Sequence, residues 1–301
     1  VQQPGQPSVE YPLNTAELDQ DEQALQQVLQ SAKSQRVPTM TQLVDLIAIN
    51  ELLGTVESSG DGKNANLVAQ LETESLAAKA AEFKTTNNDD TIGWIRIPNT
   101  NVDYPVVYKA GVENYAYYES KGYDKQYSKD GVIWADYECT FPELSQNTTL
   151  YGHNWHNIYT PRTQANMQAN DLMFSLVMSY NYTDFAQENP FVYFSTTEQD
   201  YVFQVFASYY TDLNFGYNYA QMSQEDFQKV IAEAKAKSLS NYNVPVTSED
   251  KIVTLSTCTR VHGNTNNQRF VVMAKLVPVG TPSTTISTHS NPIAYNSSID
   301  A

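Results

Sequence analysis

The chain has 301 residues, of which 41% are hydrophobic and 17% charged, and a net charge of −16; this length allows one large core or two smaller ones. The acidic balance argues against a nucleic-acid partner, because the sequence has no basic stripe to meet phosphates. No run of about 18 apolar residues is present to span a bilayer, and two cysteines are too few for a disulfide scaffold.

The N-terminal quarter is predicted to be mostly helical. Residues 1–14 form a polar stretch rich in Pro and Gln, which we interpret as a disordered linker. Helical patterns follow at 15–35, 39–53 and 66–84, the first with acidic residues early and basic residues late, as the helix dipole favours. We therefore expect an N-terminal helical region over 15–87 that packs or forms a stalk, with a docking element or a lid as the alternative.

From Gly93 onward the apolar residues alternate with the period of β-strands. The stretch GWIRIPNTNVDYPVVY (93–108) indicates a strand, a Pro-Asn turn and a second strand. Further strands are predicted in the segments GVIWADYECTF, TTLYGHN, PFVYFST, DYVFQVFASYYTD, KIVTLSTC and RFVVMAKLV. About eight short strands with little helix between them indicate a mainly β fold over 88–280, closed or nearly closed into a barrel.

Two helices are predicted to interrupt the strands, and the tail is predicted to lack structure. One helix is expected at 172–185, around MFSLVMSY, and the other at 223–237, where Ser223 and Asp226 resemble a capping box. Residues 281–301 show no apolar periodicity, so we expect a disordered C-terminal tail.

One predicted strand, IVTLSTC (252–258), ends on Cys258, and the next begins at Arg269. Two adjacent antiparallel strands would bring these ends side by side, and a nearby cation favours the reactive thiolate. Arg269 is preferred over Arg260, because Arg260 lies in the intervening loop with no strand to fix it. Ser256, on the same strand face as Cys258, and Thr257 are candidate substrate contacts.

A thiolate nucleophile also needs a proton partner, and the chain has four histidines. His153 ranks first, because it ends the strand TLYGHN and a strand end holds a side chain rigidly beside a cleft. His262, in the loop after the cysteine, ranks second, His156 third, and His289 lies in the polar tail. Asp136 is a candidate to orient His153, although a surface carboxylate is the preferred interpretation.

Four segments together resemble the sortases, and within them class B: TLSTC (254–258), YGHN (151–154), the strand that opens on Arg269, and GWIRIPNTNVDYPVV (93–107). The similarity covers roughly residues 88–278. It implies a closed eight-stranded sortase-type β-barrel with peripheral helices. It also implies that Cys258 is the nucleophile, that His153 is the general acid/base, and that Arg269 stabilises the oxyanion or holds the substrate backbone.

The resemblance implies a cysteine transpeptidase. Such an enzyme cleaves a sorting motif near the C-terminus of a secreted protein after its threonine, through a thioacyl intermediate, and transfers the acyl group to an amine of the cell wall or a pilin. The chain opens without Met, so we expect a processed form, without its anchor, of a protein that acts at the extracellular face of the membrane or in the cell wall. Two alternatives stay open: a cysteine peptidase that releases product to water, and a surface binding module whose catalysis has lapsed.

Several features depart from the family pattern or stand outside it. The segment after YGHN, WHNIYTPRTQANMQAND, is longer than expected and is predicted to reshape one wall of the cleft. Thr259 follows the cysteine where some class B members have an acid. Cys139 is expected to be a plain small residue, buried or in a loop. The acidic residues are scattered, so no metal or other cofactor is expected.

Overall fold

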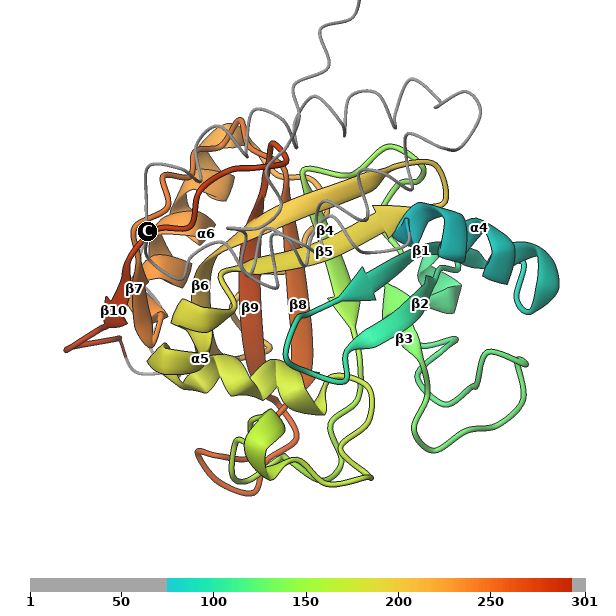
Figure 1. Cartoon of the computed structure of the whole chain (residues 1–301), viewed down its shortest axis with the longest axis horizontal. Helices are drawn as coiled ribbons and strands as arrows, with labels where there is room; N and C mark the ends of the chain where they lie inside the picture. Colours follow the sequence, from blue (N-terminus) through green and yellow to red (C-terminus); the bar gives the residue numbers. More distant parts are fainter. Residues whose placement is uncertain (1–74, 294–301) are drawn as a thin grey trace, which may run out of the picture. The chain divides into compact units, whose positions relative to one another are not determined.

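The computed structural model of the chain describes residues 75–293, and at their centre lies a closed barrel of eight strands (Figure 1). The strands follow one another around the barrel in the order β1-β2-β3-β4-β8-β9-β6-β5. Their bounds are β1 Thr91–Arg96, β2 Asp103–Val107, β3 Ile133–Ala135, β4 Asn147–Tyr151, β5 Phe191–Thr196, β6 Asp200–Asp212, β8 Ile252–Cys258 and β9 Gln268–Val277. The predicted closed, mainly β barrel is therefore confirmed.

The barrel is mixed, because two of its neighbouring strand pairs are parallel. β2 runs parallel to β3, and β4 runs parallel to β8, while the remaining pairs are antiparallel. Residues 252–257 of β8 are all buried, as are most residues of β9. A strand that is buried on both faces has a continuous run of apolar residues instead of alternating apolar and polar ones. This explains the sequences IVTL in β8 and FVVMA in β9.

Helices α4 and α6 lie on the outside of the barrel. Helix α4, Leu76–Thr86, is capped by Ser75, whose hydroxyl accepts a hydrogen bond from the amide of Ala78, and it packs on Trp94 of β1. Helix α6, Gln224–Lys237, packs on β6 (Figure 1). It begins after Ser223, whose hydroxyl accepts from the amide of Asp226 at 3.1 Å, as the predicted cap requires.

The prediction of one continuous helix at 172–185 is wrong. The structure has a 3₁₀ helix η4, Ser175–Asn181, and then a short helix α5, Thr183–Glu188. Tyr182 between them has extended backbone angles, which ends one helix and starts the other. Residues 175–180 are all buried, so the apolar run reflects burial on every side and not a one-sided helix.

The tail also departs from expectation. Strand β10, Ile286–Thr288, pairs antiparallel with β7, Ser240–Tyr242, inside the range expected to be disordered. Ile286 is buried against the main core, and three residues are too few to produce a recognisable period. Two short 3₁₀ helices, η2 Val112–Asn114 and η3 Gln164–Asn166, complete the elements of the described part.

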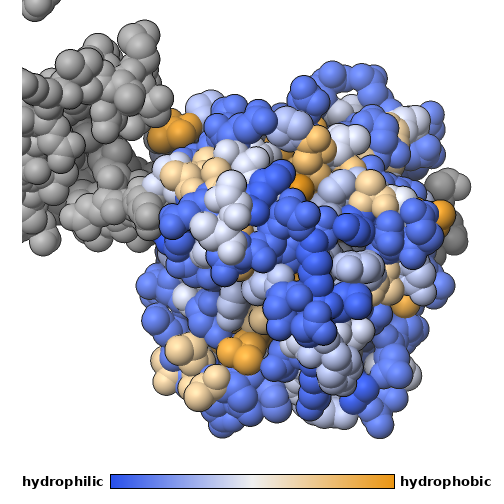
Figure 2. Space-filling view, turned by 90° about the vertical axis from the view of Figure 1, so that its right-hand side faces the viewer, coloured by the Kyte–Doolittle hydropathy of each residue, from blue (hydrophilic) through white to orange (hydrophobic). Residues whose placement is uncertain are grey.

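Several predictions lie partly or wholly outside the described residues. The linker at 1–14 and the helices at 15–35 and 39–53 fall there, and the third predicted helix is described only from Leu76 onward, as α4. Within 75–293, no helix combines the length and apolar character needed to cross a bilayer. The face seen in Figure 2 is mostly hydrophilic, with small separate hydrophobic spots instead of one broad apolar patch.

Candidate active site

The ends of three neighbouring strands bring His153, Cys258 and Arg269 into one row. In the parallel pair β4–β8, Tyr151 lies opposite Ser256, and His153 and Cys258 each follow two positions later. In the antiparallel pair β8–β9, Cys258 lies opposite Arg269. Because neighbouring strands lie about 4.8 Å apart, the backbone places the histidine on one side of the cysteine and the arginine on the other.

Side-chain hydrogen bonds extend the β4–β8 pairing to the end of the row. The hydroxyl of Thr257 donates to the carbonyl of Gly152 at 2.7 Å, and the amide of Asn154 donates to the carbonyl of Cys258 at 3.3 Å. A Cβ on Gly152 would lie 2.7 Å from Cγ of Phe174, so any larger residue before His153 would have to displace that buried ring. The two strand ends are therefore fixed to each other on both sides of the histidine.

The imidazole of His153 is held by a backbone carbonyl and two indoles. Its Nε2 lies 2.5 Å from the carbonyl oxygen of Glu119. Because a carbonyl oxygen only accepts, Nε2 carries the hydrogen, and in the neutral ring Nδ1 is left as the acceptor. The ring stacks on Trp155, with centroids 4.9 Å apart, and tilts against Trp134 at 5.9 Å. Trp155 is fixed in turn by a hydrogen bond from its Nε1 to the carbonyl of Lys129.

The two arginines have different surroundings. The guanidinium of Arg269 donates to the carbonyls of Asn266 and Gln268, both at 2.9 Å. Both acceptors are neutral backbone carbonyls. The guanidinium of Arg260 instead donates to the side chain of Asn266 at 2.8 Å, and its backbone amide donates to Ile158. The register thus places Arg269, and not Arg260, opposite the cysteine, as predicted.

Ser256 and Thr257 are buried, and both hydroxyls have partners within the protein. Ser256 Oγ lies 2.8 Å from the hydroxyl of Tyr217, and Thr257 bonds to Gly152. Burial raises the pKa of Tyr217, against the smaller lowering effects of the Ser256 hydrogen bond and the Arg269 charge. Substrate contact by Ser256 and Thr257 stays a prediction, and as described neither presents a free hydroxyl to solvent.

Sequence reasoning missed Tyr217. It lies in the segment between β6 and α6, which carries no strand or helix period. Its ring belongs to the main core, and its hydroxyl reaches the strand that ends on Cys258. No residue pattern could have indicated this contact, because it depends on how an irregular segment folds back on the barrel.

Asp136 does not orient His153, nor is it the surface carboxylate that was preferred. It is buried, and its carboxylate accepts from the Tyr151 hydroxyl at 2.7 Å and from the Glu138 amide at 2.9 Å. Burial raises the pKa of this carboxyl, against the weaker effect of those hydrogen bonds. Its role is therefore to support β4 two residues before the histidine.

The remaining histidines and the second thiol are placed apart from the row of strand ends. His262 is exposed and packs edge-on against Tyr210 with ring centroids 4.8 Å apart, and desolvation of the ring lowers its pKa. His156 is exposed, and Nδ1 of His289 contacts the Ser238 carbonyl beyond β10. Cys139 is a buried free thiol, as expected, and burial raises its pKa to about 12.

The long segment after His153 is hydrogen-bonded to the loop that follows Cys258, and its effect on the substrate cleft stays a prediction. The carbonyl of Ile158 accepts from the Arg260 amide at 2.8 Å and from the Thr259 hydroxyl at 3.2 Å. The hydroxyl of Tyr159 donates to Asn264 at 3.3 Å. The 155–172 loop and the 259–267 loop are thus joined directly after the cysteine.

Farther along the 155–172 loop, residues 163–166 line a cavity of about 570 Å³ together with Asn99 and residues of α5. His153, Cys258 and Arg269 are not among the residues that line it. Among the described side chains, no group of three or more His, Cys, Asp and Glu residues is placed to hold a metal ion.

Comparison with known proteins gives a consistent result. The model of the sortase domain family matches residues 95–277. Sortase B of Staphylococcus aureus (strain NCTC 8325 / PS 47) is 30% identical over 193 residues, which cover 64% of this chain and 72% of that protein. The structure of a Staphylococcus aureus sortase B–substrate complex superposes with a TM-score of 0.57 at 27% identity, covering 72% of this chain and 93% of that one. A sortase B complexed with triglycine gives a TM-score of 0.55 at 27% identity, covering 72% and 94% of the two chains.

Proposed function

Because the chain belongs to the sortase family, we propose that His153, Cys258 and Arg269 form the active site of this sortase B-like transpeptidase. We propose that it cleaves a sorting motif in secreted proteins and transfers the acyl group to an amine of the cell wall or of a pilin. The observation that carries the proposal is the row of these three residues across adjacent strand ends.

The proposed reaction has two acyl-transfer steps. The Cys258 thiol gives its proton to Nδ1 of His153, and the resulting thiolate attacks the carbonyl carbon of the motif's threonine. The developing oxyanion accepts hydrogen bonds from the guanidinium of Arg269. When the peptide C–N bond breaks, His153 donates a proton to the leaving amine, and the acyl group stays on sulfur. The acceptor amine then attacks the thioester carbonyl and gives a proton to His153, and the thiolate leaves.

The surroundings of each group support its role. The planar fork of the Arg269 guanidinium suits an oxyanion better than a point charge does. The Glu119 carbonyl on Nε2 of His153 leaves Nδ1 as the nitrogen that exchanges the proton. Because the family acts on secreted proteins, we place the reaction at the extracellular face of the membrane or in the cell wall.

The proposal is tested with the purified chain, a library of pentapeptides and triglycine as the amine, an acceptor suggested by the relative that was complexed with that tripeptide. We expect peptide cleavage that triglycine accelerates, with triglycine attached to the product. Cys258→Ala abolishes it, whereas Cys139→Ala, which removes the buried thiol, retains it. Unchanged cleavage by Cys258→Ala would overturn the proposal.

The same experiment separates the alternatives. A product that carries water and no amine at any triglycine concentration indicates a cysteine peptidase. A thiol-reactive probe at neutral pH should label Cys258 and leave Cys139 unlabelled, because Cys139 is buried and its pKa is raised to about 12. Failure of a folded chain to label indicates a binding module. Replacing triglycine with a lysine-containing peptide distinguishes wall anchoring from pilus assembly.

A further inference from the structure

We propose that Asp90 and Tyr118 are positioning residues for His153, which they reach through the backbone carbonyl of Glu119. The inference rests on the proposed role of His153 as the general acid/base. It concerns the β2–β3 loop (residues 108–132), which lies far from Cys258 in the sequence.

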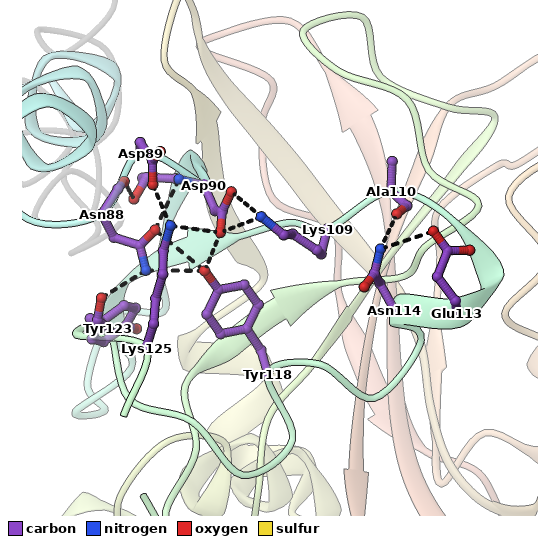
Figure 3. A network of polar contacts seen from close by, with 11 residues as sticks. Asn88, Asp89, Asp90, Lys109, Ala110, Glu113, Asn114, Tyr118, Tyr123 and Lys125 are labelled. Atoms are coloured by element: carbon purple, nitrogen blue, oxygen red, sulfur yellow. Dashed lines mark hydrogen bonds and ion pairs between the residues drawn. The ribbon is translucent and has the colours of Figure 1, made fainter. Parts of the chain in front are cut away.

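Asp90 is the centre of a polar network that ties this loop to the start of β1 (Figure 3). Its carboxylate accepts from the Tyr118 hydroxyl at 2.6 Å and from Lys109 at 2.9 and 3.1 Å, and it pairs with Lys125 at 3.1 Å. The Asp90 side chain is only 14% exposed. One shielded carboxylate thus faces two ammonium groups and a phenol from the loop, which makes each contact stronger than it would be in open solvent.

A second anchor lies beside the first. The side-chain amide of Asn88 donates to the Tyr123 carbonyl at 2.8 Å and reaches the Tyr118 hydroxyl at 3.2 Å. Tyr123 donates its own hydroxyl to the carbonyl of Pro105 in β2 at 2.8 Å. Tyr118 is 1% exposed, so this part of the loop is packed as tightly as a core element although it has no regular strand or long helix.

The anchored residue Tyr118 directly precedes Glu119, whose carbonyl lies 2.5 Å from Nε2 of His153. A loop carbonyl has no ladder of its own to fix it, so its position depends on the anchors beside it. If Tyr118 is released, the carbonyl no longer selects the ring tautomer with hydrogen on Nε2. A fraction of the His153 rings then carries its hydrogen on Nδ1. In those rings Nδ1 has no free lone pair and cannot accept a proton from the thiol or from the acceptor amine.

The test is Tyr118→Phe, which keeps the ring and removes the hydroxyl that meets Asp90. The matched control is Tyr180→Phe, because the Tyr180 hydroxyl is equally buried and donates to the Asn189 carbonyl at 2.8 Å outside this loop. We expect kcat to fall about tenfold in Tyr118→Phe, a part of the 10²–10⁴-fold that a general acid/base contributes. KM should stay within about twofold, and the control should keep wild-type kcat at a similar loss of Tm.

The decisive measurement is the ¹⁵N NMR spectrum of the histidine rings, taken without substrate. We expect the wild-type chain and the control to show His153 with hydrogen on Nε2, and Tyr118→Phe to show a mixture of tautomers. If Tyr118→Phe does not fold, Asp90→Asn replaces it as the test. This variant weakens the same anchor but keeps the Tyr118 side chain, and it should give the same mixture of tautomers.

An unchanged tautomer with unchanged kcat in both loop variants would overturn the inference, as would an equal loss of kcat in Tyr180→Phe. The NMR measurement needs no turnover, so it is independent of the Cys258→Ala experiment that tests the proposed function. A wild-type chain that shows the Nε2 hydrogen but cleaves no peptide would refute the function and leave the positioning intact.

Discussion

Gly131 offers the most direct test of how tightly the His153 ring is held. It ends the β2–β3 loop with φ +58°, and a Cβ there would lie 2.8 Å from the Glu119 carbonyl oxygen and 2.9 Å from Cδ2 of His153. Ordinary contacts begin at 3.4 Å, so the added Cβ of Gly131→Ala must move about 0.6 Å farther from the carbonyl oxygen and about 0.5 Å farther from the ring. The alanine therefore separates the two partners whose hydrogen bond fixes the tautomer.

We expect Gly131→Ala to lose much more activity than stability. The left-handed backbone destabilises alanine by about 1–2 kcal/mol, and the added methyl by about 1–3 kcal/mol. Displacement of the ring should reduce kcat/KM by up to about 100-fold. The control is Gly280→Ala, since Gly280 has φ +83° with no atom within 4 Å of the added Cβ. It carries the backbone strain without the collision.

The assay is peptide cleavage with triglycine, alongside urea unfolding of both variants. Gly280→Ala should lose about 1–2 kcal/mol and keep kcat/KM close to wild type. If Gly131→Ala folds, and its kcat/KM stays within about threefold of the Gly280→Ala value, then the ring is not held by this contact and the reasoning is refuted.

Three further predictions concern the surroundings of the site. Trp155→Ala should lower kcat by about three- to tenfold, because an aromatic pair contributes about 0.5–1.5 kcal/mol. Trp155→Phe should recover most of the lost kcat. An effect on KM alone would contradict the stacking role of Trp155. Arg269→Lys should lower kcat by at least about 100-fold, as loss of an oxyanion donor does, whereas Arg260→Lys should stay within about threefold; the reverse order would assign the oxyanion contact to the loop arginine. Burial raises the pKa of Asp90, but hydrogen bonds from Tyr118, Lys109 and Lys125 outweigh it and lower the pKa below 3.8 overall. The ionised Asp90 therefore stabilises the fold, and above about pH 3.8 the wild type should be more stable than Asp90→Asn by the full amount. That difference should vanish as the pH falls through the lowered pKa, and urea titrations in which it persists in acid would contradict the assignment.

Of the two strand pairings at the site, the sequence pattern predicts one, the pairing that sets Cys258 opposite Arg269. A strand that ends on Cys258, a loop and a strand that begins near Arg269 specify an antiparallel pair by chain connectivity alone. The neighbour on the other side could not be predicted this way. β4 and β8 pair in parallel about 100 positions apart, and alternation identifies a strand without naming its partner. His153 ranks first among the histidines because it ends a predicted strand, and it also matches a family motif, but only the closed barrel explains why its strand lies beside that of the cysteine.

The groups that hold His153 and its strand in place could not be predicted from the sequence, for a different reason. The Glu119 contact uses a backbone carbonyl, which any residue supplies, so no residue type marks it. Asp90 stands in the acidic run NNDD, which looks like a solvated turn until Lys109 and Lys125 are brought to it. Asp136 was misjudged in the same way, because the sequence does not show that its carboxylate turns inward to Tyr151.

The strands and the loops of the site therefore determine different quantities. Register fixes which residues stand next to Cys258, and it is set by many ladder bonds that no single side chain controls. Register does not determine which nitrogen of His153 carries hydrogen, because that depends on one carbonyl in an irregular loop. A shielded carboxylate with two lysines and a buried phenol is a strong anchor for such a loop. Substitutions in the β2–β3 loop should consequently lower kcat by more than their loss of stability explains, and substitutions within β8 should lower kcat and stability together.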